Sequence, residues 1–586
     1  MLKTLYQQVK QYRTASLLTP TFTALEVVMD VLIPYVTASL IDKGINAGDM
    51  EKVYYYGAVM LGMACLSLTF GILAGRFSAY ASTGFAANLR SAMYRNIQRF
   101  AFSDIDKYST SGLITRMTTD VNSLQNAFQQ IMRVTVKAPF RLILSILMCL
   151  VIDARLSLIF LVALVVLSFS LYYIISKVAK LFQQVFVKYD ELNQSVQENI
   201  TGIRLVKAFV REKYENEKFS RAAENLYKLY VRAESLMAWN HPIMNMVVYG
   251  CMIALSWMGA HYIVEGTLTT GELTSLFTYV MSILMSLMML SHIFVMLTQS
   301  AASAKRVSEI IEEEPDIVNP ANAITEIEDG SIEFRNVRFD YSKEQVQHRR
   351  SALYNISFKV KSGETIGVIG GTGSGKSTLV NLVSRLYDPT KGEILVGGRN
   401  VKEYDLTALR SAVSVVLQQN ILFSGSVLDN LRWGNPNATL EECRQACKMA
   451  QADEFISQMP EGYDTHIEQG GTNVSGGQKQ RLCIARALLK HPKILVLDDS
   501  TSACDTATDA KIREAFHTQL PEMTKFIIAQ RILSVKDCDR ILVLDNGAMT
   551  GFDTHENLLK TNTLYQEINA IQHEDGGDFD KKGGEA

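Results

Sequence analysis

Residues Gly370 to Thr378 read Gly-Gly-Thr-Gly-Ser-Gly-Lys-Ser-Thr, and this stretch decides the fold of the domain around it. The apolar run from Ile366 to Ile369 precedes it, and the helix-compatible run from Leu379 to Val383 follows. A strand, a glycine-rich turn and a helix start form the context in which G-x-x-x-x-G-K-[ST] cradles phosphate. Glycines let successive N–H groups point inward, and the helix N-terminus adds partial positive charge. The stretch therefore predicts a site for a nucleoside triphosphate.

Individual side chains of this stretch have predicted roles. Lys376 would reach the β- and γ-phosphates, and the Ser377 hydroxyl would ligate Mg²⁺. A chance glycine loop is the alternative, and the position after a predicted strand argues against it. The residues that we expect around the phosphates are Gly370, Gly373, Ser374, Gly375, Lys376, Ser377 and Thr378.

Composition divides the 586-residue chain into two unlike halves, which indicates more than one domain. Long runs nearly free of charge extend to about Ser300, and a soluble α/β pattern begins at Ser331. A net charge of −2 gives no basic excess for neutralising phosphates, so no nucleic-acid partner is expected. The eight cysteines show no paired or metal-type spacing, which fits a reduced, cytosolic side for the second half.

Six apolar stretches reach the length of about 20 residues that crosses a bilayer. Both long polar connections, between spans two and three and between spans four and five, are rich in Lys and Arg. Because such an excess marks the cytoplasmic side, we expect both termini and both connections in the cytosol. The six predicted spans are Leu17–Ile41, Val53–Ser78, Ile131–Ile152, Leu156–Ser176, Trp239–Val264 and Leu273–Ser300.

Each long connection has a helical pattern and is expected to turn back on itself beyond the headgroups. Short polar turns suit the tips, at Asp104–Tyr108 in the first connection and at or near Glu212–Tyr214 in the second. These tips either dock on the nucleotide domain or are solvated hairpins without such a role. We favour docking, because the nucleotide domain needs a mechanical contact to drive the membrane spans.

Two features within the spans bear on a substrate. Glu26 and Asp30 are four residues apart and share one helix face. They form either an acidic wall for cationic substrates or a pair of interior hydrogen-bonding residues, and these interpretations remain open. Methionines of the sixth span, Met285 among them, would suit a broad hydrophobic pocket with His292 as a polar point, although packing or lipid contact explains methionines more often.

Domain boundaries follow from changes in pattern. We expect a transmembrane domain at 1–310, a polar, proline-containing linker at 311–330 and a nucleotide-binding domain at 331–572. The Gly- and Asp-rich residues 573–586 are expected to form a disordered tail.

Four further motifs resemble those of ATP-binding-cassette exporters. Gly112–Asp120 and Glu198–Phe209 resemble segments near the coupling helices, Val474–Gln478 the signature motif, and Ile494–Asp498 the Walker B strand. The resemblance implies a multi-domain fold: an α-helical transmembrane domain of six spans with long cytoplasmic extensions, then an α/β P-loop nucleotide-binding domain. It also implies ATP and Mg²⁺ as cofactors and a bacterial inner or plasma membrane location.

Roles for single residues follow from this resemblance. Tyr341 would stack on adenine, Gln418 would reach Mg²⁺ and the attacking water, and Asp498 would hold Mg²⁺ through water. The signature residues Ser475, Gly476, Gly477 and Gln478 would close over the ATP of the opposite subunit. One chain with six spans and one cassette is therefore half of a dimer.

Two positions depart from the family pattern. Asp499 stands where the family has a catalytic glutamate, and Gln530 stands where it has the switch histidine. Both departures lie on the hydrolytic side, so we expect a degenerate site that retains ATP, in a heterodimer whose partner supplies the competent site. The implied substrate is a hydrophobic or cationic drug-like compound. The alternatives are a homodimer with slow hydrolysis, lipid or peptide export, and a non-transporting regulatory subunit.

Overall fold

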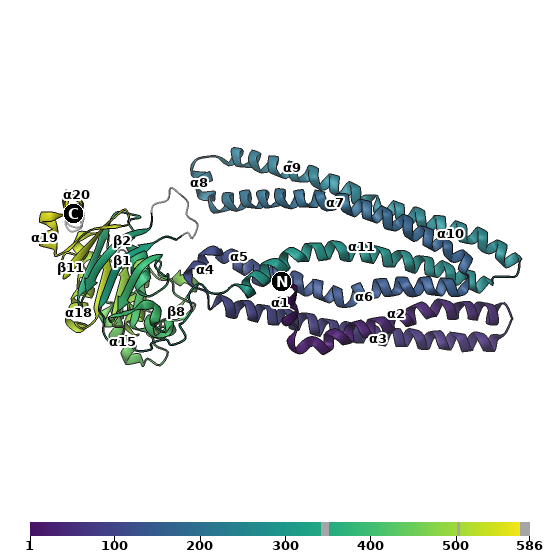
Figure 1. Ribbon diagram of the computed structural model, residues 1–586, viewed down its shortest axis with the longest axis horizontal. Coiled ribbons are helices and arrows are strands. Elements are labelled where there is room, and N and C mark those ends of the chain that lie inside the picture. Colours follow the sequence, from purple (N-terminus) through teal and green to yellow (C-terminus); the bar gives the residue numbers. More distant parts are fainter. Residues whose placement is uncertain (342–350, 501–503, 575–586) are drawn as a thin grey trace. The chain divides into compact units, whose positions relative to one another are not determined.

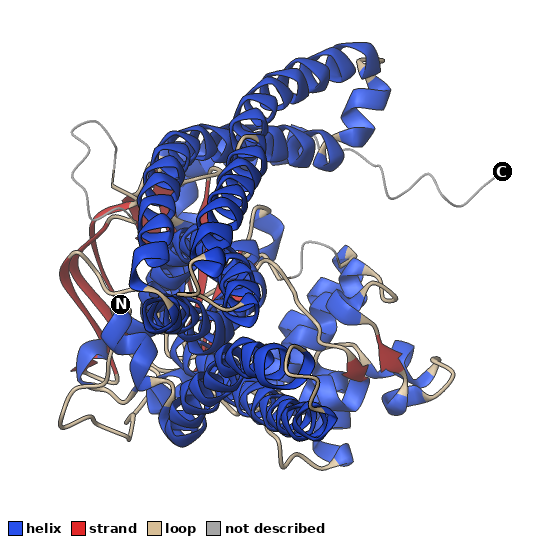
Figure 2. Cartoon of the chain, turned by 90° about the vertical axis from the view of Figure 1, so that its right-hand side faces the viewer, coloured by secondary structure: helices blue, strands red, loops and turns tan. Residues whose placement is uncertain are grey.

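Helices account for all regular structure described in the first of two units, which comprises Met1–Gln98 and Thr110–Glu313 (Figure 2). The second unit comprises Arg99–Ser109 and Glu314–Ala586, and its core is formed by β-sheets. The computed structural model describes residues 1–341, 351–500 and 504–574 (Figure 1).

Six helical segments of the described chain are long and apolar enough to cross a membrane, which confirms the six predicted spans. Several of them run far beyond the hydrocarbon core. The 48 residues of α3 extend about 72 Å, against roughly 30 Å of hydrocarbon. The segments contain α2 (Arg13–Leu40), α3 (Met50–Ile97), α6 (Val121–Ile152), α7 (Ala154–Thr201), α9 (Glu212–Ala238) with α10 (Asn240–Val264) as one segment, and α11 (Thr270–Glu312).

Contacts between α2 and α11 organise the core of the first unit. The Tyr279 hydroxyl on α11 donates to the Val31 carbonyl at 2.7 Å, and both residues are buried. At the predicted outer end, Asp42 accepts hydrogen bonds from the Thr269 hydroxyl at 2.6 Å and the Gly271 N–H at 2.9 Å. Because Thr269 caps α11, this carboxylate fixes the start of that helix against the end of α2.

The tip of the first long connection, predicted as a short polar turn at Asp104–Tyr108, is a short helix, α4 (Phe102–Lys107), which belongs to the second unit. In the second connection, α7 ends at Thr201, Gly202 follows as its C-cap, and the short helix α8 (Ile203–Ala208) comes next. The turn therefore comes before Glu212–Tyr214. Acidic residues stabilise a helix start, so Glu212 begins the return helix α9 (Figure 1).

A six-stranded sheet organises the second unit, in the order β12-β11-β3-β10-β9-β6, with every neighbouring pair parallel except β11 and β12. Parallel strands are covered on both faces, and β9 and β10 are buried throughout. The carboxyl ends of β3, β9 and β10 meet at one edge, where ligands of such sheets bind. The strand bounds are β3 (Thr365–Gly370), β6 (Val413–Val416), β9 (Ile494–Asp498), β10 (Thr524–Ile528), β11 (Arg540–Asp545) and β12 (Ala548–Asp553).

A second, antiparallel sheet of four strands, in the order β2-β1-β4-β5, packs its buried face into the same core as helix α12 (Lys376–Val383). Alternation of apolar and polar residues in β1 and β2 leaves one face exposed, as the sequence indicates. The strands are β1 (Ile332–Phe339), β2 (Leu353–Val360), β4 (Lys391–Val396) and β5 (Arg399–Asn400). Helix α20 (Thr563–Glu574) is the last element of the described chain.

Candidate nucleotide site

A cavity of about 350 Å³ opens at the carboxyl ends of β3, β9 and β10. Residues from the phosphate loop, from the loop after β6 and from the ends of β9 and β10 meet there, although they extend from Thr372 to Gln530 in the sequence. Gly370, at the end of β3, does not line the cavity, but its carbonyl accepts a hydrogen bond from Lys376 Nζ at 2.8 Å. The lining includes Tyr341, Gly373, Ser374, Gly375, Lys376, Ser377, Thr378, Gln418, Asp498, Asp499 and Gln530.

The phosphate loop has the backbone shape that its glycines permit. Gly375 has φ +98°, and a Cβ there would lie 2.7 Å from the Ala352 carbonyl oxygen, so no other residue fits without a shift. The Ser374 hydroxyl is buried and has no hydrogen-bond partner in the described part of the chain. Burial lowers the pKa of Lys376, and the nearby Asp498 and Asp499 carboxylates oppose this effect. An orphaned hydroxyl and a partly desolvated ammonium fit a phosphate ligand.

The residues predicted to hold Mg²⁺ come from three elements. Ser377 lies in the first turn of α12, Gln418 follows β6, and Asp498 ends β9. Burial raises the pKa of Asp498, while the hydrogen bond from the Ser377 hydroxyl and the charge of Lys376 lower it. Hydroxyl, amide and carboxylate oxygens are the hard ligands that Mg²⁺ prefers, so this donor set fits the ion.

Asp499 and Gln530 contact each other. Gln530 Nε2 donates to Asp499 Oδ2 at 3.1 Å. The Asp499 backbone is left-handed, with φ +49°, and its N–H donates to the Ile528 carbonyl at 3.1 Å. An amide therefore holds the carboxylate at the position where the resemblance implies a catalytic base.

The signature residues begin a different helix, α17 (Gly476–Leu488), and are not among the residues that line this cavity. Ser475 caps the helix: its hydroxyl accepts from the Gln478 N–H at 3.3 Å, and Gln478 Oε1 accepts from the Ser475 N–H at 2.9 Å. This capping box fixes an exposed helix N-terminus, which is a suitable anion-binding geometry. Residues Ser502–Asp505 resemble the D-loop of ATP-binding-cassette exporters, and Ser502 and Ala503 of this segment lie outside the described residues.

Comparison with known proteins identifies the family. The description "ABC transporter transmembrane region" matches residues 17–288, and "ABC transporter" matches residues 353–502. The ABC transporter ATP-binding protein YfiB of Bacillus subtilis is 36% identical over 543 residues, which are 93% of this chain and 94% of that protein. The chain belongs to the ABC transporter family.

Other similar proteins agree with this assignment. The ABC transporter ATP-binding protein Rv1273c of Mycobacterium tuberculosis is 34% identical over 98% of both chains. The ATP-dependent lipid A-core flippase of Syntrophus aciditrophicus is 34% identical over 83% of this chain and 80% of its own length. A bacterial Atm1-family ABC exporter with ATP bound shares the fold, with a TM-score of 0.81, 23% identity and coverage of 96% and 99%. This chain is therefore a multi-pass, ATP-driven ABC exporter subunit.

Helix α4 of this ABC exporter packs on its own nucleotide domain. The Phe102 ring lies 6.0 Å from the Tyr387 ring, and the Tyr387 hydroxyl donates to Asp106 Oδ2 at 2.6 Å. Tyr387 in turn lies 5.3 Å from the ring of Tyr341, whose hydroxyl is 2.9 Å from Thr378 Oγ1. Docking of the first tip is confirmed, and two tyrosines connect it to the phosphate-loop helix.

In the first unit, the acidic pair has a basic partner that the sequence analysis missed. Lys137 Nζ on α6 lies 2.6 Å from Glu26 Oε1 and 4.0 Å from Asp30 Oδ2. The Ser67 hydroxyl donates to Asp30 Oδ1 at 2.7 Å. These contacts favour interior hydrogen-bonding residues over an acidic wall. A lysine inside the third predicted span was the signal that could have revealed the partner.

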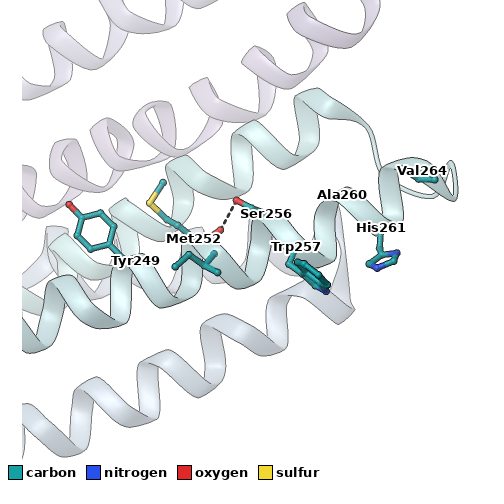
Figure 3. Close-up of a pocket in the computed structure, with 8 residues that line it drawn as sticks. Tyr249, Met252, Ser256, Trp257, Ala260, His261 and Val264 are labelled. Carbon is teal, nitrogen blue, oxygen red and sulfur yellow. Dashed lines mark hydrogen bonds between the residues drawn. The ribbon is translucent and has the colours of Figure 1, made fainter.

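The remaining features of the membrane helices provide less evidence about a substrate site. Met285 is 61% exposed, and the side chain of His292 lies outside the described residues, so their roles stay predictions. A hollow of about 910 Å³ lies along α10, from Tyr249 to Val264 (Figure 3). All eight lining residues come from this one helix and none is an acid, a lysine or an arginine, which is the kind of surface that acyl chains cover.

Proposed function

We propose that this chain is one half of a heterodimeric ATP-driven exporter and that its own ATP site hydrolyses slowly. The hydrogen bond of 3.1 Å between Gln530 and Asp499 is the observation that carries this proposal. Aspartate is one methylene shorter than glutamate, so its carboxylate lies farther from a nucleophilic water. Misplacement by about 1 Å reduces a rate by about 100-fold.

Binding and hydrolysis are separate properties of this site. Lys376, Ser377, Gln418 and Asp498 line one cavity and suit ATP and Mg²⁺. Glutamine can donate a hydrogen bond to a phosphate oxygen, but unlike histidine it carries no titratable proton near neutral pH. The site is therefore suited to retaining ATP, and the intact signature at Ser475–Gln478 is suited to completing the partner's site.

Orientation and cargo complete the proposal. The nucleotide domain, both termini and both tips lie in the bacterial cytosol, as the Lys and Arg excess indicates. The cargo is a hydrophobic or amphiphilic molecule that enters from the bilayer. A cationic drug-like preference rested on Glu26 and Asp30, and the contact with Lys137 weakens that argument. Export of a lipid is the second candidate, because a flippase is among the relatives.

Purification of the chain alone and with a co-expressed second half-transporter tests the proposal. Alone, the chain should bind ATP and turn it over at least about 10-fold more slowly than the complex. A Lys376→Ala variant of the chain should lose ATP binding and serves as the control for contaminating ATPases. Robust hydrolysis by the chain alone would support the homodimer instead.

A further inference from the structure

Helix α6 carries three basic residues at intervals of four, Arg133, Lys137 and Arg141. Residues four apart share one helix face, and their Cα atoms lie about 6 Å apart along the axis. All three fall within the predicted third span, Ile131–Ile152. The second predicted span contains one further basic residue, Arg76. The six predicted spans together therefore contain four Lys and Arg residues but only two acidic residues, Glu26 and Asp30. The spans therefore carry a basic excess.

Contacts place this basic face toward α2 and α3. Lys137 reaches Glu26 and Asp30 of α2. Gly75 of α3 lies beside Arg133: a Cβ on this glycine would be 3.7 Å from Arg133 Nη1. The guanidinium of Arg133 therefore lies beside α3 at Gly75.

Among the residues that the structure describes, the two arginines differ from Lys137 in having no anionic partner. No carboxylate of the described residues lies within 4.0 Å of Arg133 or Arg141. The Nε atom of Arg141 is buried and has no hydrogen-bond partner in the described part of the chain. A cation at membrane depth is costly, and such residues ordinarily pair with an anion or line a substrate path. Lys137 is already compensated, so an external anion would bind at the arginines.

We propose that Arg133 and Arg141 bind the phosphate or carboxylate headgroup of an amphiphilic substrate. This inference rests on the proposed export function and names its substrate class. The ligand is an amphiphile because the arginines lie among apolar spans, where a molecule dissolved in the bilayer arrives with its tail in hydrocarbon. A guanidinium matches a phosphate or carboxylate with two parallel hydrogen bonds.

The spacing also gives the two arginines different positions along the path. Arg133 is two residues from the predicted inner end of its span, and Arg141 lies about 12 Å farther along the axis. That distance is close to half the hydrocarbon thickness of about 30 Å. A headgroup thus meets Arg133 near the inner surface and Arg141 near the midplane. Lys137 lies between the two arginines, but its ammonium is paired with Glu26 and does not bind the headgroup.

Binding of two matched amphiphiles tests the site in the complex reconstituted in phosphatidylcholine nanodiscs. Dodecyl phosphate should bind at least about 10-fold more tightly than dodecyltrimethylammonium. The double variant Arg133→Gln/Arg141→Gln should weaken dodecyl phosphate binding about 10-fold, the loss expected for a charge-assisted hydrogen bond. Each single variant, Arg133→Gln or Arg141→Gln, should lose one of the two binding positions and so lower the number of dodecyl phosphate molecules bound. Arg141→Lys should restore part of the affinity. Arg155→Gln, at the start of α7, should leave it unchanged.

Three outcomes overturn the proposal. Equal affinity for dodecyl phosphate and dodecyltrimethylammonium would show that the site has no preference for anions. Unchanged binding of dodecyl phosphate to folded Arg133→Gln and Arg141→Gln complexes would show that the arginines do not bind the headgroup. Dissociation or a lowered Tm of these complexes, without a change in amphiphile preference, indicates that the arginines pair with a carboxylate of the second subunit.

Transport distinguishes a substrate from a resident lipid. In proteoliposomes, ATP should move fluorescent phosphatidylglycerol between leaflets, and Arg141→Gln should reduce this rate more than that of fluorescent phosphatidylcholine. Arginine-dependent binding without ATP-driven movement overturns the substrate role. The proposed slow ATP site is judged separately by the turnover of the chain alone, so the two failures are distinguishable.

Discussion

The carboxylate of Asp499 is held by features that the identity of the residue does not reveal. Its backbone is left-handed, at φ +49°, which aspartate tolerates better than most residues do. Gln530, 31 positions later, donates to it because β9 and β10 are parallel neighbours that end together. The sequence alone predicts that an aspartate and a glutamine replace the family's glutamate and histidine. It does not predict that the two replacing side chains contact each other.

Restoring both family residues should raise hydrolysis at this site. In the complex, Asp499→Glu with Gln530→His is expected to increase turnover by about 10- to 100-fold, because the longer carboxylate and a titratable ring return to the nucleophilic water. Turnover is measured with the partner's phosphate-loop lysine replaced, so that only this site reports. Unchanged turnover with ATP still bound would place the defect elsewhere.

Nucleotide affinity should depend on pH through Lys376. Burial lowers the pKa of this ammonium from its ordinary value of 10.5, so the charge is lost at a lower pH than for an exposed lysine. Bound phosphate favours the charged form, and affinity therefore falls as the pH rises through the lowered pKa. Titration of fluorescent ATP between neutral and alkaline pH measures this. Constant affinity up to pH 10.5 would contradict it.

At the scale of elements, the hydroxyl of Tyr387 is one of the contacts that join α4 to the nucleotide domain. Tyr387→Phe keeps the ring against Phe102 but removes the hydrogen bond to Asp106, which costs about 1 kcal/mol. We expect nearly normal ATP affinity and reduced stimulation of ATPase by transported compounds. Tyr404→Phe is the matched control, because this buried hydroxyl donates to the Val396 carbonyl and does not contact α4. Equal effects of the two variants would argue against a coupling role.

The ion pair between α2 and α6 should matter for folding more than for cargo charge. Lys137→Met leaves Glu26 and Asp30 without their cation and is expected to destabilise the protein by about 3 kcal/mol. Neutralising all three, with Glu26→Gln, Asp30→Asn and Lys137→Gln, should recover most of the loss. Thermal unfolding in detergent compares the variants. A stable Lys137→Met protein would show that the carboxylates have another partner.

Elements differed in how far their sequences predicted them. Length and apolar composition were sufficient for six spans, and polar residues identified the tip at Asp104–Tyr108. The second tip was placed too late, since the acidic residues at Glu212 are a helix-start signal that resembles a polar turn. Lys137 was missed because pairing across helices depends on tertiary contacts, which a pattern within one span does not contain.

At the scale of the whole molecule, this chain's signature should matter more to ATPase than its own Walker B end. Ser475→Ala is expected to lower total hydrolysis by the complex more than Asp499→Ala does, because the signature would serve the competent site. Steady-state ATPase of both complexes tests this ordering. The reverse ordering would mean that hydrolysis occurs at this chain's own phosphate loop.

Membership of α4 in the second unit has a consequence for protein engineering. Asp106 and Tyr387 are 281 positions apart, so the ribosome completes the membrane half before the partner of this helix exists. An exchange of nucleotide domains between relatives, cut at the end of α11, would leave residues 99–109 of one parent facing a foreign surface. A graft that carries this segment with its own cassette keeps the interface whole, and the useful crossover points are therefore three rather than one.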